Sequence, residues 1–183
     1  MPPSEEFLTV RCARRLVAIA TSCLAAATFS LSLAAPASAA GDDYPYRTAT
    51  TNAADRWGFT QRQCVSFVAW REAQAGHPVS NVTQHWGSAL NWDNAARAGG
   101  YWISSRPRVG AIAQWNAGER SSWWANGSPT ANGYVQAGPY GHVAWVRSVY
   151  ADGSALIEQY NMFGNRSYST MRVKAPRYIY YKV

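Results

Sequence analysis

The feature that most constrains the fold of this 183-residue chain is a change of pattern near residue 100. Before it, apolar residues recur at helical spacing over 61–75 and 88–98, and glycine follows each segment. Helices that precede a series of short strands predict an α+β domain, with N-terminal helices packed on an antiparallel β-sheet. The strands are predicted after residue 100 from short apolar or alternating segments over 111–115, 142–150, 155–160, 166–173 and 178–183.

Two further features complete this organisation. Thr60 is a natural N-cap for the first helix, and Gln63, three residues later, completes a capping-box pattern. Residues 116–140 are rich in Gly, Asn, Ser, Trp and Pro, which predicts a long irregular insertion before the strand that starts at His142.

The first forty residues have the pattern of an export signal. Three arginines precede an apolar run over 16–33, and Ala37, Ser38 and Ala39 provide the small residues that a signal peptidase requires. The alternative is an uncleaved membrane anchor, because the run has roughly the length of a membrane span. We expect cleavage, which divides the chain into a signal peptide over 1–40, a lead-in segment over 41–56 and one domain over 57–183.

Export changes what the cysteines can do. Cys12 and Cys23 lie in the predicted signal, so the exported chain keeps Cys64 alone. A secreted protein that uses cysteine for stability carries pairs. The remaining thiol is therefore a buried apolar residue, an intermolecular linker or a reactive group.

The position of Cys64 favours the reactive alternative. It falls in the first turn of the predicted helix, where the helix dipole and the unpaired backbone N–H groups favour the thiolate. The same N–H groups offer a site for the oxyanion that forms when sulfur attacks a carbonyl. A cysteine nucleophile requires a base, and among His77, His85 and His142 the last is best placed, because it begins a strand directly after a glycine.

The imidazole also requires an acceptor that orients it. Glu158 and Asn161 lie at the end of the strand that follows His142. If the turn at Asp152 and Gly153 closes a hairpin, the start of one strand lies beside the end of the next. This geometry predicts that Glu158 lies beside His142.

Charge and aromatic content indicate the surroundings of the protein. The formal net charge of +7 favours polyanions such as teichoic acids, anionic lipid or extracellular nucleic acid. All nine Trp follow residue 40, more than a core of this size requires, which suggests a glycan or peptide groove besides core packing. Three His without paired metal-ligand spacing offer little support for zinc, and we expect no metal or cofactor.

Four motifs in this order resemble the CHAP family of cysteine, histidine-dependent amidohydrolases and peptidases. The similarity runs from about Trp57 to Val183, nearly the whole exported chain. In the family's first strand motif Gly-Asp is common, whereas this chain has Gly110 and Ala111. The four motifs are QCVSFVAW over 63–70, RVGAIAQW over 108–115, GHVAWV over 141–146 and IEQYN over 157–161.

The resemblance implies a papain-like fold, with the nucleophile on the first long helix and the base on the central sheet. It implies hydrolysis of a peptidoglycan amide, either between glycan and stem peptide, as in an N-acetylmuramoyl-L-alanine amidase, or within the peptides, as in an endopeptidase. Gln63 and Trp115 are expected on the oxyanion or substrate side of the site. The catalytic group implied by position is Cys64 as nucleophile, His142 as base, Glu158 as the group that orients His142, and Asn161.

The resemblance also sets the expected partners. We expect peptidoglycan as substrate and anionic wall polymers, rather than nucleic acid, as partners of the basic surface. We expect a secreted monomer that is associated with the cell wall and is not inserted in a membrane after cleavage.

Three alternatives stand beside this interpretation. NlpC-type wall peptidases share the Cys–His order, but they usually show Asp-Cys-Ser-Gly where this chain has Gln63-Cys64-Val65-Ser66. A non-catalytic module could bind cell-wall glycan through its tryptophans and positive charge, with an inert cysteine. An exported toxin or immunomodulatory factor could use the same fold.

Overall fold

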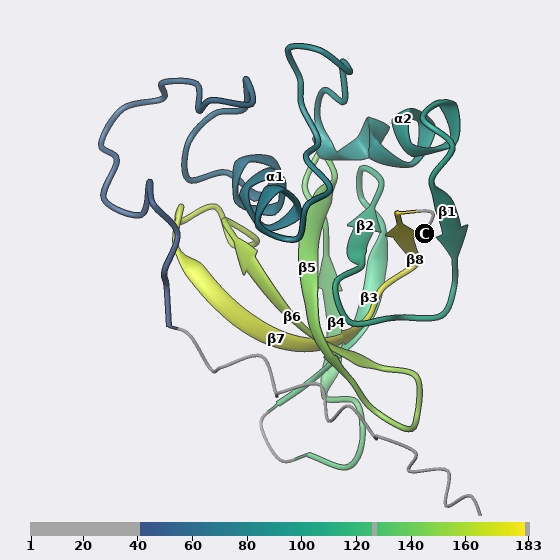
Figure 1. The fold of residues 1–183 in the computed structure, drawn as a ribbon. Coiled ribbons are helices and arrows are strands. Elements are labelled where there is room, and N and C mark those ends of the chain that lie inside the picture. The colour runs from purple at the N-terminus through teal and green to yellow at the C-terminus, as the bar shows by residue number, and fades with distance from the viewer. Residues whose placement is uncertain (1–40, 126–127, 182–183) are drawn as a thin grey trace, which may run out of the picture. The chain divides into compact units, whose positions relative to one another are not determined.

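The computed structural model describes residues 41–125 and 128–181, so the predicted signal peptide over 1–40 lies outside the described residues. In the described part, no helix is both long and apolar enough to cross a membrane. The helices come first in the chain and the strands follow (Figure 1). The elements are α1 (Cys64–Gln74), η1 (Ala89–Asn91), α2 (Trp92–Ala98), β1 (Trp102–Ser104), β2 (Ile112–Trp115), β3 (Arg120–Trp124), β4 (Gly133–Gln136), β5 (His142–Val149), β6 (Ala155–Tyr160), β7 (Tyr168–Lys174) and β8 (Arg177–Tyr180).

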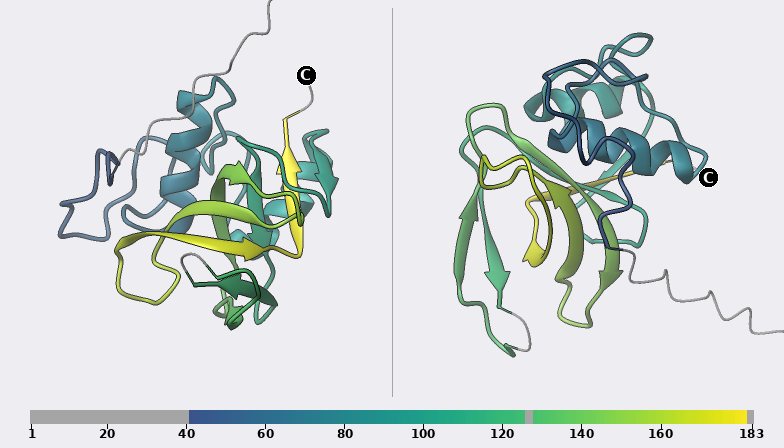
Figure 2. Two further views of the ribbon diagram at one scale, coloured as in Figure 1. Left: turned by 90° about the horizontal axis from the view of Figure 1, so that it is seen from below. Right: turned by 90° about the vertical axis from the view of Figure 1, so that its left-hand side faces the viewer.

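The strands form one antiparallel sheet in the order β1-β8-β2-β5-β6-β7-β3-β4. The sheet is strongly curled, and the helices lie on one side of it (Figure 2). Helix α1 packs on β5 and β6 in the middle of this order. The predicted antiparallel sheet is therefore confirmed, and few helices accompany it.

Each face of the sheet carries its own core. The core between helices and sheet is built from aromatic rings, including Tyr44, Phe67 and Trp92, all fully buried. Tyr44 belongs to the 41–56 segment, so this lead-in contributes to the core. The opposite, concave face is filled by smaller residues around Trp115 and Tyr178. Alternate residues of the central strands point into alternate cores, as the pleat requires.

Helix α1 begins later than predicted. Gln63 is the N-cap, and no side chain caps the helix, so the predicted capping box at Thr60 is wrong. The reason lies in the backbone, because Arg62 has a φ of 60°, which interrupts any helix that starts at residue 61. The helix start is held instead by tertiary contacts, since the Ser66 hydroxyl donates to the buried Asp55 carboxylate.

The segment 116–140 is not the irregular insertion that we predicted. It contains β3 and β4, which pair with each other, and β3 also pairs with β7. The hairpin thus extends the sheet beyond β7. Turn residues such as Gly118 and Asn132 dominate the composition of this segment. For this reason the sequence pattern does not predict its two strands, which have five and four residues.

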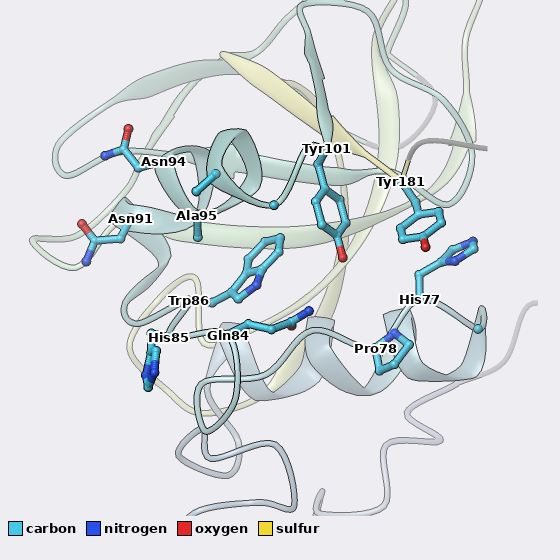
Figure 3. Close-up of a pocket in the computed structure, with 13 residues that line it drawn as sticks. His77, Pro78, Gln84, His85, Trp86, Asn91, Asn94, Ala95, Tyr101 and Tyr181 are labelled. Carbon is cyan, nitrogen blue, oxygen red and sulfur yellow. The ribbon is translucent and has the colours of Figure 1, made fainter.

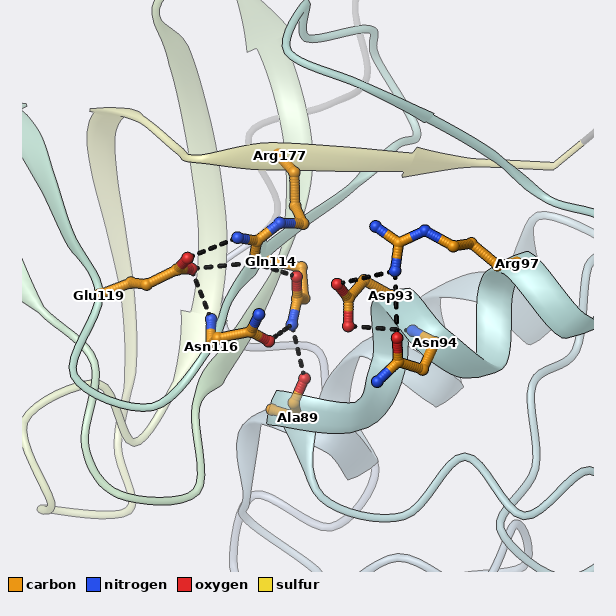
Figure 4. Close-up of polar contacts among 8 residues, drawn as sticks. All are labelled: Ala89, Asp93, Asn94, Arg97, Gln114, Asn116, Glu119 and Arg177. Carbon is orange, nitrogen blue, oxygen red and sulfur yellow. Dashed lines mark hydrogen bonds and ion pairs between the residues drawn. The ribbon is translucent and has the colours of Figure 1, made fainter.

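A network of polar side chains ties η1 to the sheet (Figure 4). The Gln114 side chain, fully buried on β2, donates to the Ala89 carbonyl and to Asn116 Oδ1, each at 2.9 Å. Arg177 on β8 donates to Gln114 Oε1 at 2.7 Å and to Glu119 at 2.8 Å. Because these groups satisfy one another, η1 is fixed against β2.

At Gly141, directly before β5, the chain passes close to the backbone of η1 and of the end of β2. Gly141 has a φ of 72°, and a Cβ there would lie 2.5 Å from the Trp115 carbonyl oxygen and 2.6 Å from the Leu90 nitrogen. Both neighbours are backbone atoms and cannot move independently. The residue before His142 therefore has to be glycine.

We predict that Gly141→Ala lowers the free energy of unfolding by about 3 kcal/mol or more, because positive φ and backbone overlap act together. The matched control is Gly100→Ala, at a φ of 75° with no atom within 4 Å of the added Cβ. It should cost only about 1–2 kcal/mol, the conformational part alone. Urea unfolding of the two variants tests this, and equal losses would contradict the argument.

Candidate active site

Two elements bring the predicted nucleophile and base to one cavity. Cys64 is the first residue of α1, and His142 is the first residue of β5. Both line a cavity of about 740 Å³, together with Gln63 and Asn161. Helix α1 packs on β5, and the Val143 N–H group at the start of β5 lies where it lowers the pKa of the Cys64 thiol. Four of the six predicted site residues therefore share one cavity.

The surroundings of Cys64 act on its thiol in two directions. Burial raises the pKa of the Cys64 thiol to about 11, while backbone N–H groups of Val143, Val65 and Cys64 itself lower it by a smaller amount. The helix start therefore favours the thiolate as expected, but burial has the larger effect on the pKa in the resting site. Desolvation of the sulfur outweighs the N–H groups that face it, and the thiol is protonated at neutral pH.

His142 is buried on the concave side of the sheet. Its ring packs against Trp115, with centroids 5.8 Å apart and planes at 58°. Burial lowers the pKa of His142 to about 3, and the nearby Gln159 side chain opposes this shift. The imidazole is therefore neutral at pH 7, which is the form that can take a proton from a thiol.

Gln159 is the functional residue that the sequence did not reveal. Its amide is fixed at both ends, because Nε2 donates to the Ser169 hydroxyl and Oε1 accepts the Met162 N–H at 2.9 Å. The Gln159 side chain opposes the effect of burial on the pKa of His142, whose buried Nε2 has no hydrogen-bond partner among the described residues. The sequence offers one signal for this residue. Successive residues of a strand point to opposite faces of the sheet, so Gln159 faces away from Glu158.

Glu158 lies on the other face of the sheet. In the β5–β6 pairing it is opposite Trp145, three residues from His142, so its side chain points toward α1. There it forms an ion pair with Arg71 at 2.7 Å, and Arg71 also pairs with Asp43 at 2.9 Å. The prediction that Glu158 lies beside His142 is wrong. The part of β5 between the turn and His142 is longer than the part of β6 between the turn and Glu158, so the two residues do not lie opposite each other.

Asn161 contacts Gln63, on the side of the cavity that carries Cys64. Its Nδ2 donates to Gln63 Oε1 at 2.6 Å, and its Oδ1 accepts the Arg166 N–H at 2.7 Å. Asn161 has a φ of 62°, which a short polar side chain tolerates better than most. These contacts hold Gln63, the residue before Cys64, against the turn after β6.

Trp115 is fully buried behind the His142 ring and is not among the residues that line the cavity. The expected contact with substrate is therefore replaced by a packing contact with the base. The tryptophan excess has a similar explanation, because most of these rings belong to the cores. The buried ones are Trp57, Trp70, Trp86, Trp92 and Trp115.

The other two histidines lie at a larger cavity of about 870 Å³, between the end of α1 and α2 (Figure 3). His77 stacks on Tyr181 with ring centroids 4.1 Å apart, and His85 lies at the other end of the cavity. Neither Cys64 nor His142 lines this space. Among residues 41–125 and 128–181, no group of three or more His, Cys, Asp or Glu side chains is placed to hold a metal ion.

The cavity at Cys64 therefore combines three chemical capacities. It holds a protonated thiol, a neutral imidazole, which is the form that acts as a base, and backbone N–H groups that lower the pKa of the thiol. An oxyanion that forms on a carbon bound to this sulfur would develop beside the same N–H groups. This combination suits acyl transfer through a thioester.

Comparison with known proteins gives a consistent result. The family model described as CHAP domain matches residues 54–161. The N-acetylmuramoyl-L-alanine amidase sle1 of Staphylococcus epidermidis is 38% identical over 116 residues, which cover 62% of this chain and 29% of the relative. The sle1 protein of Staphylococcus aureus is 38% identical over 103 residues, which cover 56% of this chain and 24% of the relative.

A solved structure is also similar. The 2.15 Å crystal structure of an N-acetylmuramoyl-L-alanine amidase from Staphylococcus aureus superposes with a TM-score of 0.54 at 29% sequence identity. The match covers 72% of this chain and 34% of that chain. The chain thus spans about a third or less of the length of the proteins that it matches.

The pKa of Cys64 makes a direct prediction for its reactivity. Because burial raises that pKa to about 11, the thiolate fraction and the rate of iodoacetamide alkylation should rise about tenfold per pH unit between pH 7 and 10. Residues 41–183 contain Cys64 as their sole cysteine, so a protein of this length suits the measurement. His142→Ala should leave the slope unchanged. A rate that is already constant between pH 6 and 9 would instead show a resting thiolate–imidazolium pair.

Proposed function

Because the chain belongs to the CHAP-domain family, whose model matches more than half of it, we propose that it hydrolyses an amide bond of peptidoglycan through a thioester on Cys64. The observation that carries this proposal is the cavity shared by Cys64 and His142, with backbone N–H groups at the sulfur. The names of the relatives favour the amide between N-acetylmuramic acid and L-alanine over a bond within the stem peptide.

The first step is attack of the Cys64 sulfur on the amide carbonyl carbon. His142 removes the thiol proton as the S–C bond forms, because both groups are neutral before substrate binds. The carbonyl oxygen gains negative charge, and the N–H groups of Cys64, Val65 and Val143 that face the sulfur are the nearest donors to it. Gln63, held by Asn161, lies at the same edge of the cavity.

The second step breaks the C–N bond. The imidazolium of His142 returns its proton to the leaving amine, which departs as the free amino terminus of the stem peptide. The muramyl acyl group remains on Cys64 as a thioester. Neutral His142 then activates a water molecule, whose attack releases the acid and restores the thiol.

Gln159 acts on this cycle by orienting the base. An amide oxygen that accepts the imidazole N–H fixes the ring and stabilises the imidazolium, without adding a negative charge that would hold the proton on the ring at rest. Glu158, paired with Arg71 behind α1, supports the helix that carries Cys64. We assign Gln159 the orienting role and Glu158 a structural one.

The same inference extends to the fold and the setting of the protein. A nucleophile at a helix start, packed on a sheet that carries the base, is a papain-like arrangement. With the predicted export signal and the positive charge, it supports a secreted protein that works at the anionic cell wall as a monomer.

Zymography on purified cell walls tests the nucleophile. We predict that Cys64→Ala lowers the rate of clearing by a factor of about 10⁴ or more, because no other group can form the thioester. Mass spectrometry of the fragments from the parent protein should show free L-alanine amino termini and intact muramyl acids. Clearing by Cys64→Ala would reject the mechanism, and new termini within the peptides would indicate an endopeptidase.

Paired variants on β6 test the orienting group. Gln159→Leu should lower kcat by roughly 10- to 100-fold with little change in KM, because the ring loses its acceptor but the cavity is unchanged. Glu158→Gln should mainly lower the thermal stability, because it leaves Arg71 partly unpaired beside a buried site. The reverse pattern, with kcat sensitive at Glu158 and not at Gln159, would contradict the assignment.

A further inference from the structure

Three exposed aromatic side chains lie around the catalytic cavity and its neighbour. Tyr140 is 73% exposed, Tyr134 is 69% exposed and Phe163 is 62% exposed. We call these three residues the aromatic shelf. Large exposed aromatic rings that gather at one place on a soluble protein usually mark a binding surface. None of the three has a role in the proposed chemistry.

The shelf continues from the catalytic cavity into a second one. Met162 and Gly164 line the cavity of Cys64, while Phe163 between them lines a separate cavity of about 330 Å³. Tyr140 lines the catalytic cavity, and Tyr134 lines the second one. The turn after β6 is therefore the common wall of the two spaces, and a ligand that crosses Phe163 can reach both.

The turn that presents Phe163 is tied to the orientation of the base. The Met162 N–H donates to Gln159 Oε1 at 2.9 Å, and the Gly164 N–H donates to the Asn161 carbonyl at 3.2 Å. The Gln159 amide, which acts on the pKa of His142, thus also fixes the turn that carries Phe163. Contacts on the shelf and chemistry at His142 share one rigid support.

The lining of the second cavity indicates what it binds. It contains aromatic and apolar side chains and the Gln136 amide, with no charged residue: Trp123, Tyr134, Val135, Gln136, Phe163 and Met171. Aromatic faces pack against the C–H faces of sugar rings, and a side-chain amide can both donate to and accept from an acetamido group. A stem peptide, which carries carboxylates, would find no cation in the lining itself, and Arg120 lies outside it, over the Tyr134 ring at 5.5 Å.

We propose that the aromatic shelf and this second cavity form a subsite for the N-acetylated sugars of a glycan strand. The inference rests on the proposed function, because it places the glycan beside the amide that Cys64 attacks. It assigns a binding role to the β3–β4 hairpin, which supplies Trp123 and Tyr134. The bound glycan strand would run from the catalytic cavity across Phe163 toward β4.

Titration of a soluble probe tests the subsite without turnover. The probe is a β-1,4-linked tetramer of N-acetylglucosamine, and the protein is the full chain with Cys64→Ala, studied by calorimetry. Phe163→Ala should weaken binding about three- to tenfold, and Phe163→Tyr should retain it, because the ring face is kept. The matched control is Val109→Ala, at a side chain that is 61% exposed and lines neither cavity.

Each outcome has a defined meaning. Equal affinity for Phe163→Ala and its parent overturns the subsite, as does a parent that does not bind the tetramer. A dimer that Phe163→Ala dissociates would show that the shelf binds a second copy of the chain instead, which also overturns it. If the chain with Cys64 intact fails to clear walls while the Phe163-dependent binding persists, the proposed function fails and the subsite stands.

Discussion

The site depends on the contact between the start of α1 and the start of β5. The N–H group of Val143, the second residue of β5, lowers the pKa of the thiol of Cys64, the first residue of α1. This contact requires the helix to approach the strand closely, and a glycine at position 141 allows the chain to enter β5 under η1. Without this close approach of helix to strand, the Cys64 thiol and the His142 imidazole, on opposite sides of β5, would not share a cavity.

The sheet separates two kinds of electrostatic interaction. On the helix side, Glu158 and Arg71 form an ion pair that supports α1. On the concave side, the neighbours of His142 described above are Trp115 and Gln159, and both side chains are neutral. Because strand residues alternate between faces, adjacent positions 158 and 159 serve these two environments. The base therefore stays neutral at rest, although a carboxylate lies one residue away in the sequence.

Much of this site could be predicted from residue type and local pattern. A lone cysteine at a helix start and a histidine after a glycine at a strand start are local features, and both were placed correctly in one cavity. Gln159 could not be found this way, because its role depends on strand register, which needs pairing partners distant in sequence. The hairpin over 120–136 and the buried state of most tryptophans were missed for the same reason, since tertiary packing overrides turn-rich composition. The raised pKa of Cys64 likewise reflects burial, which local spacing does not show.

The central claim is that Cys64 carries the acyl group during turnover. Acid quenching of a reaction with purified muropeptides, followed by mass spectrometry of the intact protein, tests it most directly. The account predicts a protein adduct whose mass equals the muramyl acyl portion of the substrate, located on the peptide that contains Cys64. Hydrolysis of the muropeptide by a protein that never carries such an adduct, with Cys64 unmodified throughout under conditions that trap thioesters, would contradict it.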